Sequence, residues 1–247
     1  MKYAIHQSNK AYTIDSTQAA DITLSINKSE NVNCYYLSEP SFKYFESEAF
    51  SGNLSKGGSV NCEQMSFYAH ASGTHTECAL HVAPVEFDMR HIQFDPLMLG
   101  QMFTISPSQM GEDSVIDANS FASLSNPHQA KVILVRTLPN PSSKCQANYS
   151  GTNPVYFDPA VLLSIKALGF EHLICDLPSI DKESDEGKLL AHKNWFLDQG
   201  QAIVKRTITE LTFMPNHLHD GLYAVQMQVP KIQSDAVPSS IVIYPCA

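Results

Sequence analysis

Three histidines and a glutamate are concentrated in residues 70–81, which read HASGTHTECALH. If residues 75–81 are extended, His75, Glu77 and His81 project from one face, because side chains alternate along a strand with a period of two. Two imidazoles and a carboxylate on one face can bind a first-row metal ion and leave one group for acid–base chemistry. The same spacing also fits a polar strand edge with exposed histidines, so spacing alone leaves both interpretations open.

Four landmarks along residues 70–211 resemble those of the metal-dependent cyclase family, which includes bacterial kynurenine formamidases and isatin hydrolases. The segment Gly73-Thr74-His75-Thr76-Glu77, followed by His81, resembles the family signature His-x-Gly-Thr-His-x-Asp-x-Pro-x-His. Residues 176–181 (DLPSID) resemble the family's Asp-x-x-Ser-x-Asp stretch. Residues 191–193 (AHK) resemble the segment with its downstream ligand histidine, and residues 207–211 (TITEL) resemble its Glu-Asn-Leu segment. Each landmark alone is weak, but the ordered set is specific.

The resemblance implies roles for particular residues. His75 and Glu77 match metal ligands of the first motif, and His192 and Glu210 match the distant ligands. His81 matches the histidine that transfers protons. A ligand set of imidazoles and carboxylates favours zinc, with manganese as the alternative, whereas oxygen ligands alone would favour calcium or magnesium.

Two departures from the family signature bear on this metal site. The family aspartate is Glu77 here, one methylene longer, and Cys78-Ala79 replaces the following Ala-Pro. The family's first histidine would fall at Ala71, whereas this chain has His70, one residue earlier. A β-bulge would absorb the extra residue and re-aim the side chain. Whether His70 is a ligand stays open, and without it one metal ion is favoured over two.

His81 must be brought back toward His75 by a bend in the chain. Six residues of straight strand at about 3.3 Å each would separate the two side chains by roughly 20 Å, which is too far for one site. We expect the bend at Ala79-Leu80, where the family carries proline. Cys78 alternates with Glu77 and is expected to point away from the site.

Other polar residues are assigned supporting or surface positions. Asp176 and Asp181 follow a predicted buried strand, and we expect them to shape a turn or to support the ligands rather than bind metal. His217 and His219 precede the turn signal Asp220-Gly221, which predicts an exposed approach to a hairpin.

The elements that position these residues follow from apolar patterns and turn residues. Apolar runs at residues 131–136 and 172–175 predict buried strands. Residues 158–169 begin with an acidic N-cap and a proline and end with glycine, which predicts a helix between these strands in a βαβ-like unit. Four more segments are predicted: strands at 22–26, 222–229 and 241–244, and a helix from about 187 to 198. Residues 52–59 are predicted to form a loop.

The expected fold is an α/β domain that spans residues 1–247. The length of 247 residues suits one large domain, and the first half is rich in short β-like runs. The resemblance implies the swivelling β/β/α fold, a barrel-like β arrangement flanked by helices.

Charge and composition limit the classes of partner and the cell compartment expected for this chain. The chain has 25 acidic and 16 basic residues and a net charge of −9, which argues against nucleic acid and anionic membranes. No run reaches the roughly 20 apolar residues of a membrane span, and the first residues lack the apolar core of a signal peptide. Six cysteines without a CxxC pair favour reduced thiols, so a cytoplasmic protein is expected. The resemblance implies a homodimer or a homotetramer.

The function expected from these residues is hydrolysis of a carbon–nitrogen amide bond in a small molecule. A divalent metal would activate water, and His81 would carry its proton to the departing nitrogen. The resemblance implies an aryl formamide or a cyclic amide as substrate. Two alternatives stay open: a lactonase-type C–O hydrolase with the same groups, and a non-catalytic descendant that binds a small ligand.

Overall fold

The two apolar runs of the βαβ-like unit form adjacent parallel strands, β10 (Val132–Thr137) and β12 (His172–Cys175). The helix α1 (Pro159–Ala167) lies between them in the sequence. The Asp158 carboxylate caps this helix by accepting a hydrogen bond from the N–H of Ala160. The prediction of this strand–helix–strand unit is therefore confirmed.

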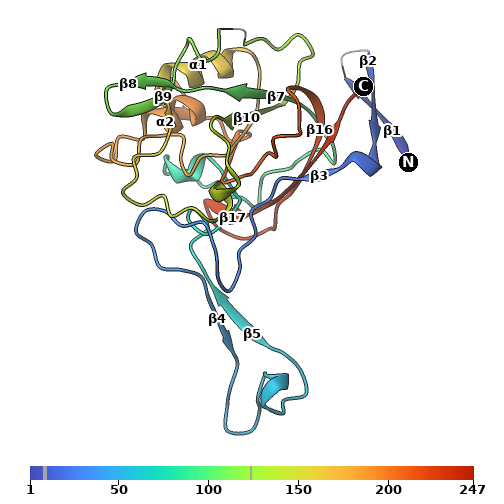
Figure 1. The fold of residues 1–247 in the computed structure, drawn as a ribbon, viewed down its shortest axis with the longest axis vertical. Helices are drawn as coiled ribbons and strands as arrows, with labels where there is room; N and C mark the ends of the chain where they lie inside the picture. The colour runs from blue at the N-terminus through green and yellow to red at the C-terminus, as the bar shows by residue number, and fades with distance from the viewer. Residues whose placement is uncertain (8–9, 123) are drawn as a thin grey trace.

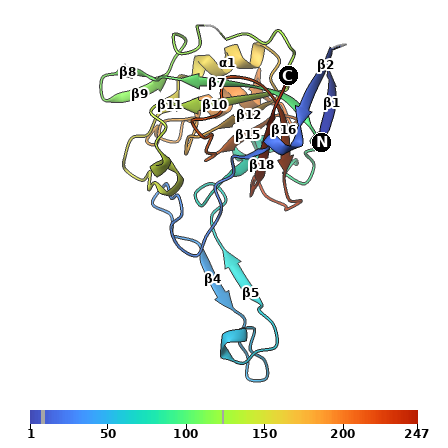
Figure 2. The ribbon, with the colours of Figure 1, turned by 45° about the vertical axis from the view of Figure 1, so that its right-hand side comes forward.

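Both strands belong to a large curled sheet (Figures 1 and 2). The computed structural model describes residues 1–7, 10–122 and 124–247, and within these the sheet has nine strands. The four central strands β15, β12, β10 and β7 are parallel, and antiparallel strands flank them on both sides. From edge to edge the order is β17 (Ala236–Pro238), β6 (His75–Glu77), β15 (Thr207–Glu210), β12, β10, β7 (Met98–Ile105), β16 (Gly221–Gln228), β18 (Ser240–Pro245) and β3 (Ala20–Asp21).

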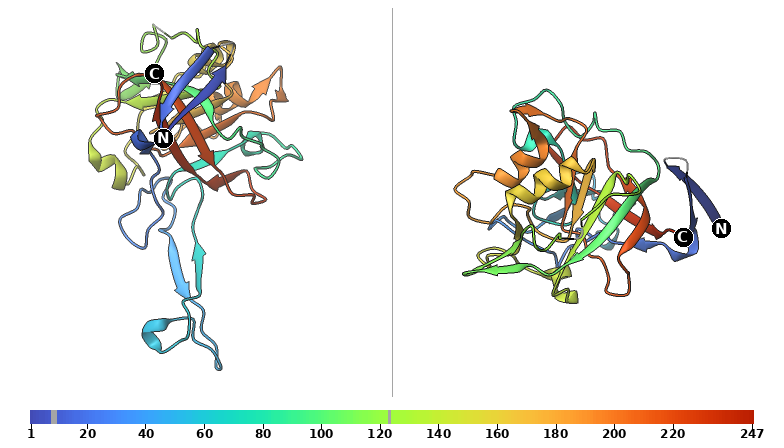
Figure 3. Two further views of the ribbon diagram at one scale, coloured as in Figure 1. Left: turned by 90° about the vertical axis from the view of Figure 1, so that its right-hand side faces the viewer. Right: turned by 90° about the horizontal axis from the view of Figure 1, so that it is seen from above.

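Apolar side chains cover both faces of the sheet. On one face, Ile133 and Val135 of β10 pack in a cluster with α1 and α2 (Leu190–Phe196). On the other face, Val132 and Leu134 pack with side chains of β7, β16 and β18, which the curl of the sheet brings together. The helices therefore cover one face of the sheet (Figure 3), whereas the other face is packed by side chains of the strands themselves together with Ile22, Met214 and Leu218. This α/β arrangement agrees with the barrel-like fold expected from the resemblance.

A hairpin arm projects from the sheet (Figures 1 to 3). It consists of β4 (Ser41–Tyr44) and β5 (Glu63–Ser66), and the loop predicted at 52–59 lies toward its far end and contains the 3₁₀ helix η2 (Leu54–Lys56). In the described part of the chain, none of the apolar core clusters includes a residue of 41–66.

Shorter elements surround the sheet. They are β1 (Lys2–Gln7) with β2 (Lys10–Asp15), the set β8 (Ser108–Met110), β9 (Asp113–Ile116) and β11 (Tyr156–Phe157), and β13 (Leu197–Asp198) with β14 (Gln201–Ala202). Three more 3₁₀ helices are η1 (Ser16–Gln18), η3 (Ala79–His81) and η4 (Ser142–Gln146). No helix in the described ranges is long and apolar enough to cross a membrane.

The strand predicted at residues 22–26 is wrong. Its backbone groups are used by neighbouring loops instead of a ladder, since the Ile22 carbonyl accepts the N–H of Phe213 and the Leu24 carbonyl accepts that of Thr74. The chain therefore crosses the sheet edge as irregular structure with one isolated bridge, at Thr23.

The other predicted elements are present with shifted ends. The strands predicted at 222–229 and 241–244 are β16 and β18. The helix predicted from about 187 to 198 begins later, as α2, because the Asp185 carboxylate accepts hydrogen bonds from the N–H groups of Gly187 and Leu189. These bonds accompany a left-handed backbone at Leu189, with φ 47°, which a helix cannot include.

Candidate metal centre

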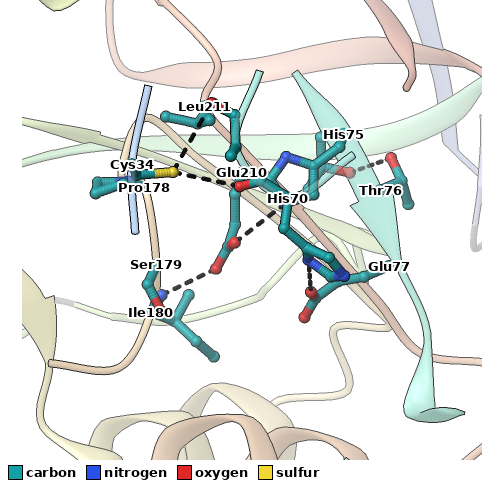
Figure 4. A network of polar contacts seen from close by, with 12 residues as sticks. Cys34, His70, His75, Thr76, Glu77, Pro178, Ser179, Ile180, Glu210 and Leu211 are labelled. Carbon is teal, nitrogen blue, oxygen red and sulfur yellow. Dashed lines mark hydrogen bonds and ion pairs between the residues drawn. The ribbon is translucent and has the colours of Figure 1, made fainter. Parts of the chain in front are cut away.

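The register between β6 and β15 places three of the predicted site residues on one face of the sheet. In this antiparallel pair His75 lies opposite Glu210, and Glu77 lies opposite Ile208, which packs beneath the helices. Side chains two residues apart on a strand share a face, so His75, Glu77 and Glu210 point to the helix-covered side. The Nε2 atom of His75 is 3.4 Å from the Oε2 atom of Glu210 (Figure 4). All three side chains are buried.

A close approach of two backbone segments sets the position of His75. A Cβ atom on Gly73 would lie 2.7 Å from the carbonyl oxygen of Leu24, so glycine is needed there. The carbonyl of Gly73 lies 3.1 Å from Nδ1 of His75 and accepts its hydrogen bond. Because a carbonyl oxygen can only accept, Nδ1 carries the ring proton and Nε2 faces the cluster with its lone pair.

His192 reaches the same cluster from α2. Its Nε2 atom is 3.1 Å from Oε1 of Glu77 and 3.7 Å from Oε1 of Glu210. Its Nδ1 atom is 2.6 Å from Oδ2 of Asp181, and Asp181 also accepts the backbone N–H groups of Ala191 and His192. The carboxylate of Asp181 thus fixes the ring with Nε2 inward, an arrangement typical of metal-binding histidines.

His70 lies at the more open side of the cluster, in the turn that precedes β6. Its Nδ1 atom is 3.2 Å from Oε2 of Glu77 (Figure 4). The bulge expected to re-aim this side chain is wrong, because His70 and Ala71 lie in a turn outside any strand ladder. The Cys34 thiol contacts the His70 carbonyl at 3.4 Å and ties this turn to the core.

His81 is brought back to the cluster by the 3₁₀ helix η3 (Ala79–His81). Its Nε2 atom is 4.0 Å from Oε2 of Glu77. The bend expected at Ala79-Leu80 is confirmed, whereas the extended segment assumed over 75–81 ends at Glu77, where β6 ends. The five predicted ligand candidates and His81 are therefore brought together at one place.

Asp235 is the residue of this cluster that the sequence did not reveal. Its Oδ2 atom lies 3.0 Å from Nε2 of His70 and 3.0 Å from Nδ1 of His81. It directly precedes β17, in which Ala236 pairs with Glu77. Asp235 is a single aspartate in a polar segment and belongs to no motif. Its position in the cluster follows only from the pairing of β6 with β17.

The inward-facing atoms of this cluster lack ordinary partners. In the part of the chain that the structure describes, Nε2 of His75 and both carboxylate oxygens of Glu77 are buried without a hydrogen bond of normal geometry. An imidazole lone pair that faces a carboxylate oxygen at close range is repulsive unless a cation lies between them. The imidazoles and carboxylates of this cluster could therefore hold a divalent metal ion, which would supply that cation.

Without a metal, protons would occupy the same place. Burial alone lowers the pKa of His192, but Glu77, Asp181 and Glu210 outweigh burial and raise it well above its usual value. Burial likewise lowers the pKa of His70, but the nearby carboxylates of Asp235 and Glu77 raise it to about 10. The cluster is therefore built to hold positive charge.

The remaining polar residues lie where their predicted roles place them. Cys78 is buried with Met89, Ile92 and Val237, away from the cluster, and burial raises the pKa of its thiol to about 11, so the nucleophilic thiolate is suppressed. His217 and His219 are exposed in the turn before β16.

Asp176 belongs to a separate buried network. It accepts hydrogen bonds from the backbone N–H and hydroxyl of Thr137, and it forms an ion pair with Lys144 at 2.8 Å. Burial raises the pKa of the Asp176 carboxyl, although Lys144 opposes this shift.

Comparisons with solved structures show which proteins share this fold. The structure resembles isatin hydrolase A from Labrenzia aggregata bound to benzyl benzoate, with a TM-score of 0.65, 11% identity and coverage of 93% of this chain and 94% of that chain. It also resembles a predicted metal-dependent hydrolase from Bacillus stearothermophilus, with a TM-score of 0.62, 13% identity and coverage of 92% and 97%. A potential metal-dependent hydrolase with cyclase activity gives a TM-score of 0.63, 14% identity and coverage of 92% and 96%.

At these identities the likeness shows a shared fold. No curated protein sequence matches the chain. The family described as "Putative cyclase" matches residues 20–182, a range that includes His70, His75, Glu77 and His81. Because this match covers more than half of the chain, the protein belongs to that cyclase family.

Proposed function

We propose that the protein is a metal-dependent hydrolase that cleaves a carbon–nitrogen amide bond in a small molecule. The observation that carries the proposal is the group of buried, inward-facing atoms of His75 and Glu77 that have no hydrogen-bond partner of normal geometry among the described residues. Membership of the cyclase family supports it. So does the resemblance to an isatin hydrolase, since isatin is a cyclic amide fused to an aryl ring.

The metal would be held by His75, Glu77, His192 and Glu210, with His70 as a further ligand. These residues supply imidazole nitrogens and carboxylate oxygens, so zinc is our first choice and manganese the alternative. When bound, a divalent metal lowers the pKa of water from near 16 to about 7 and polarises a carbonyl group.

The chain's own residues would orient the ligands and move the proton. The Gly73 carbonyl and the Asp181 carboxylate hold the rings of His75 and His192 with Nε2 inward. Nε2 of His81 is free to accept a proton from the attacking water and to deliver it to the departing nitrogen, which leaves poorly as an anion. Removing this proton shuttle would slow the reaction without releasing the metal.

The substrate would enter from the side formed by His70, His81 and Asp235. Their side chains are 26%, 24% and 34% exposed, whereas Glu77 is fully buried. A small planar amide, an aryl formamide or a cyclic amide, can approach there with its carbonyl toward Glu77 and its nitrogen toward His81.

The test combines metal content with substrate profiling. Protein purified without added metal is analysed by mass spectrometry for bound metals and assayed with formanilide, isatin and dihydrocoumarin. We expect a bound divalent metal and hydrolysis of at least one of the two amides, lost with a chelator and restored by zinc or manganese. Hydrolysis of the lactone alone would make the protein a C–O hydrolase, and absence of metal or of all hydrolysis would favour a non-catalytic ligand-binding protein.

We also propose that the chain forms a homodimer or homotetramer and works in the cytoplasm. A two-stranded hairpin is marginally stable by itself. The arm also exposes the apolar side chains of Phe45 (54%) and Met65 (63%). A second copy of the chain would cover these side chains and support the hairpin. All six cysteines lie among the described residues and are free, which suits a reducing compartment.

Light scattering tests the assembly. The Phe45→Ser/Met65→Ser variant should shift the protein toward the monomer, whereas Gln64→Ser, an exposed polar change on the same hairpin, should leave the mass unchanged. A monomeric wild-type protein would contradict the proposal.

A further inference from the structure

One carboxylate oxygen connects the two more exposed histidines of the metal centre. Oδ2 of Asp235 lies 3.0 Å from Nε2 of His70 and 3.0 Å from Nδ1 of His81. The other oxygen, Oδ1, accepts a hydrogen bond from the Ser234 hydroxyl at 3.2 Å. Both oxygens are thereby engaged, and the carboxylate is held between the two rings.

These contacts determine which nitrogen of each ring carries the proton. An ionised carboxylate only accepts hydrogen bonds, so Nε2 of His70 and Nδ1 of His81 are the donors. Nδ1 of His70 and Nε2 of His81 face Oε2 of Glu77, and in the metal-bound protein these two nitrogens keep their lone pairs.

The backbone places Asp235 firmly enough to orient a ring. Its carbonyl accepts the N–H of Cys78 at 3.0 Å, next to the pairing of Ala236 with Glu77. His81, by contrast, lies at the end of a three-residue 3₁₀ helix and is about a quarter exposed, so its own backbone does little to hold the ring. Its neighbours within ring-contact distance are the rings of His70 and His192, with centroids 4.4 and 5.3 Å away.

We propose that Asp235 is a positioning residue that aligns His81 for proton transfer and links its orientation to that of His70. This inference rests on the proposed hydrolase function. Asp235 lies outside residues 20–182, the part of the chain that the family matches, so it is assigned from this structure alone. Partners of this kind typically change activity or metal affinity by about 10- to 100-fold when they are removed.

The first experiment is a double-mutant cycle on the zinc-loaded protein with an amide that the wild-type protein hydrolyses. We expect Asp235→Ala to lower kcat by about 10- to 100-fold and His81→Ala to lower it by at least about 100-fold. The double variant should be no slower than His81→Ala, because Asp235 acts through that ring. Additive losses, or full activity in Asp235→Ala, would overturn the proposal.

Asp88→Asn is a matched control. Asp88 is a buried carboxylate that bonds Arg90 and lies 3.3 Å from Nδ1 of His91, and its neighbour Met89 donates a backbone hydrogen bond to Ser234. This change alters the same region away from the cluster, so kcat should stay near the wild-type value. A loss equal to that of Asp235→Ala would show a general structural effect and contradict a specific positioning role.

The second experiment does not depend on activity. Nitrogen-15 spectra of histidine-labelled, zinc-loaded protein should show a protected Nδ1–H on His81, assigned by its loss in His81→Gln. Asp235→Ala should remove this signal while metal content stays unchanged. If Asp235→Ala instead binds fewer metal ions even at saturating zinc, Asp235 is itself a ligand and the proposal is wrong. Failure of the wild-type protein to hydrolyse any amide would count against the proposed function, while the ring proton would still test the role of Asp235.

Discussion

Two buried carboxylates of this protein, Glu77 and Asp176, differ in what surrounds them. Both side chains are fully buried. Asp176 receives the N–H and hydroxyl of Thr137 and the ammonium of Lys144, so its charge and its lone pairs are matched within the chain. Glu77 faces three histidines, yet neither of its oxygens has a hydrogen bond of normal geometry among the described residues.

The difference separates a carboxylate that supports the fold from one kept for a ligand. Burial of an ionised group costs several kcal/mol, and a structural carboxylate recovers this cost through its own partners. Glu77 recovers it fully only when a cation joins the cluster. Substitution of Glu77 should therefore mainly abolish metal binding, whereas substitution of Asp176 should mainly lower the free energy of unfolding.

The largest effect is expected for Glu77→Gln, which keeps the side-chain volume and removes the charge. Bound metal should be lost and hydrolysis should fall by at least about 10⁴-fold, the upper end of what one acid–base group contributes. Without metal, the variant should lose little stability, because His70 and His192, whose protonated forms Glu77 stabilises, can become neutral once its charge is removed. Metal analysis and urea unfolding of the metal-free proteins measure both effects.

Glu63→Gln on the hairpin arm is the control for this prediction. Its carboxylate pairs with Lys28 at a partly exposed position away from the metal centre, so both metal content and activity should stay unchanged. Normal metal binding by Glu77→Gln would remove Glu77 from the ligand set.

His81→Ala should have the next largest effect. Because His81 is assigned to proton transfer, the variant should keep near-normal metal content and lose about 10²- to 10⁴-fold in hydrolysis. Metal analysis and kcat on the same preparation check the two parts. A metal-free variant would make His81 a ligand, and full activity would mean that another group moves the proton.

Asp176→Asn should lower stability and leave metal binding intact, the reverse of what is expected for Glu77→Gln. It leaves the largely buried ammonium of Lys144 without its counter-charge, and breaking a buried ion pair costs about 3–5 kcal/mol of unfolding free energy. Metal content should not change. Urea unfolding measures the loss, and Asp176→Asn/Lys144→Met should recover part of it, since the unpaired charge is then gone. Loss of metal with unchanged stability would reverse the assignment of the two carboxylates.

The sequence predicted those parts of the molecule that depend on local chemistry. The helix α1 has its cap, proline and glycine within residues 158–169, and β10 and β12 are continuous apolar runs, so their positions need no long-range information. The predicted site residues, with His75 and Glu77 among them, came from an ordered set of short motifs. The structure shows how the register between β6 and β15 brings His75, Glu77 and Glu210 together.

The parts that the sequence did not predict depend on contacts between distant segments. Asp235 joins the cluster only because β17 pairs with β6, and the neighbouring residues of Asp235 do not indicate this. Residues 22–26 alternate like a strand, but their backbone bonds go to Thr74 and Phe213 on other segments. The sequence predicted a loop at residues 52–59 but not the hairpin arm that carries it. The direction in which the arm extends from the sheet depends on the whole fold.

The smallest predicted effect compares two buried histidines. Carboxylates raise the pKa of His192, whereas burial lowers the pKa of His172 to about 4, and His172 has a hydrogen bond to the Thr207 hydroxyl. The unfolded chain binds a proton at His172 below pH 6.5 and the folded chain does not until about pH 4. Stability from this residue is therefore complete above pH 6.5 and is lost as the pH falls, by about 3 kcal/mol at pH 4. Urea unfolding of Glu77→Gln, in which metal loss does not add to the pH effect, should show this loss, and adding His172→Gln should reduce it by that amount. An unchanged pH slope in the double variant would mean that His172 is already charged in the folded protein.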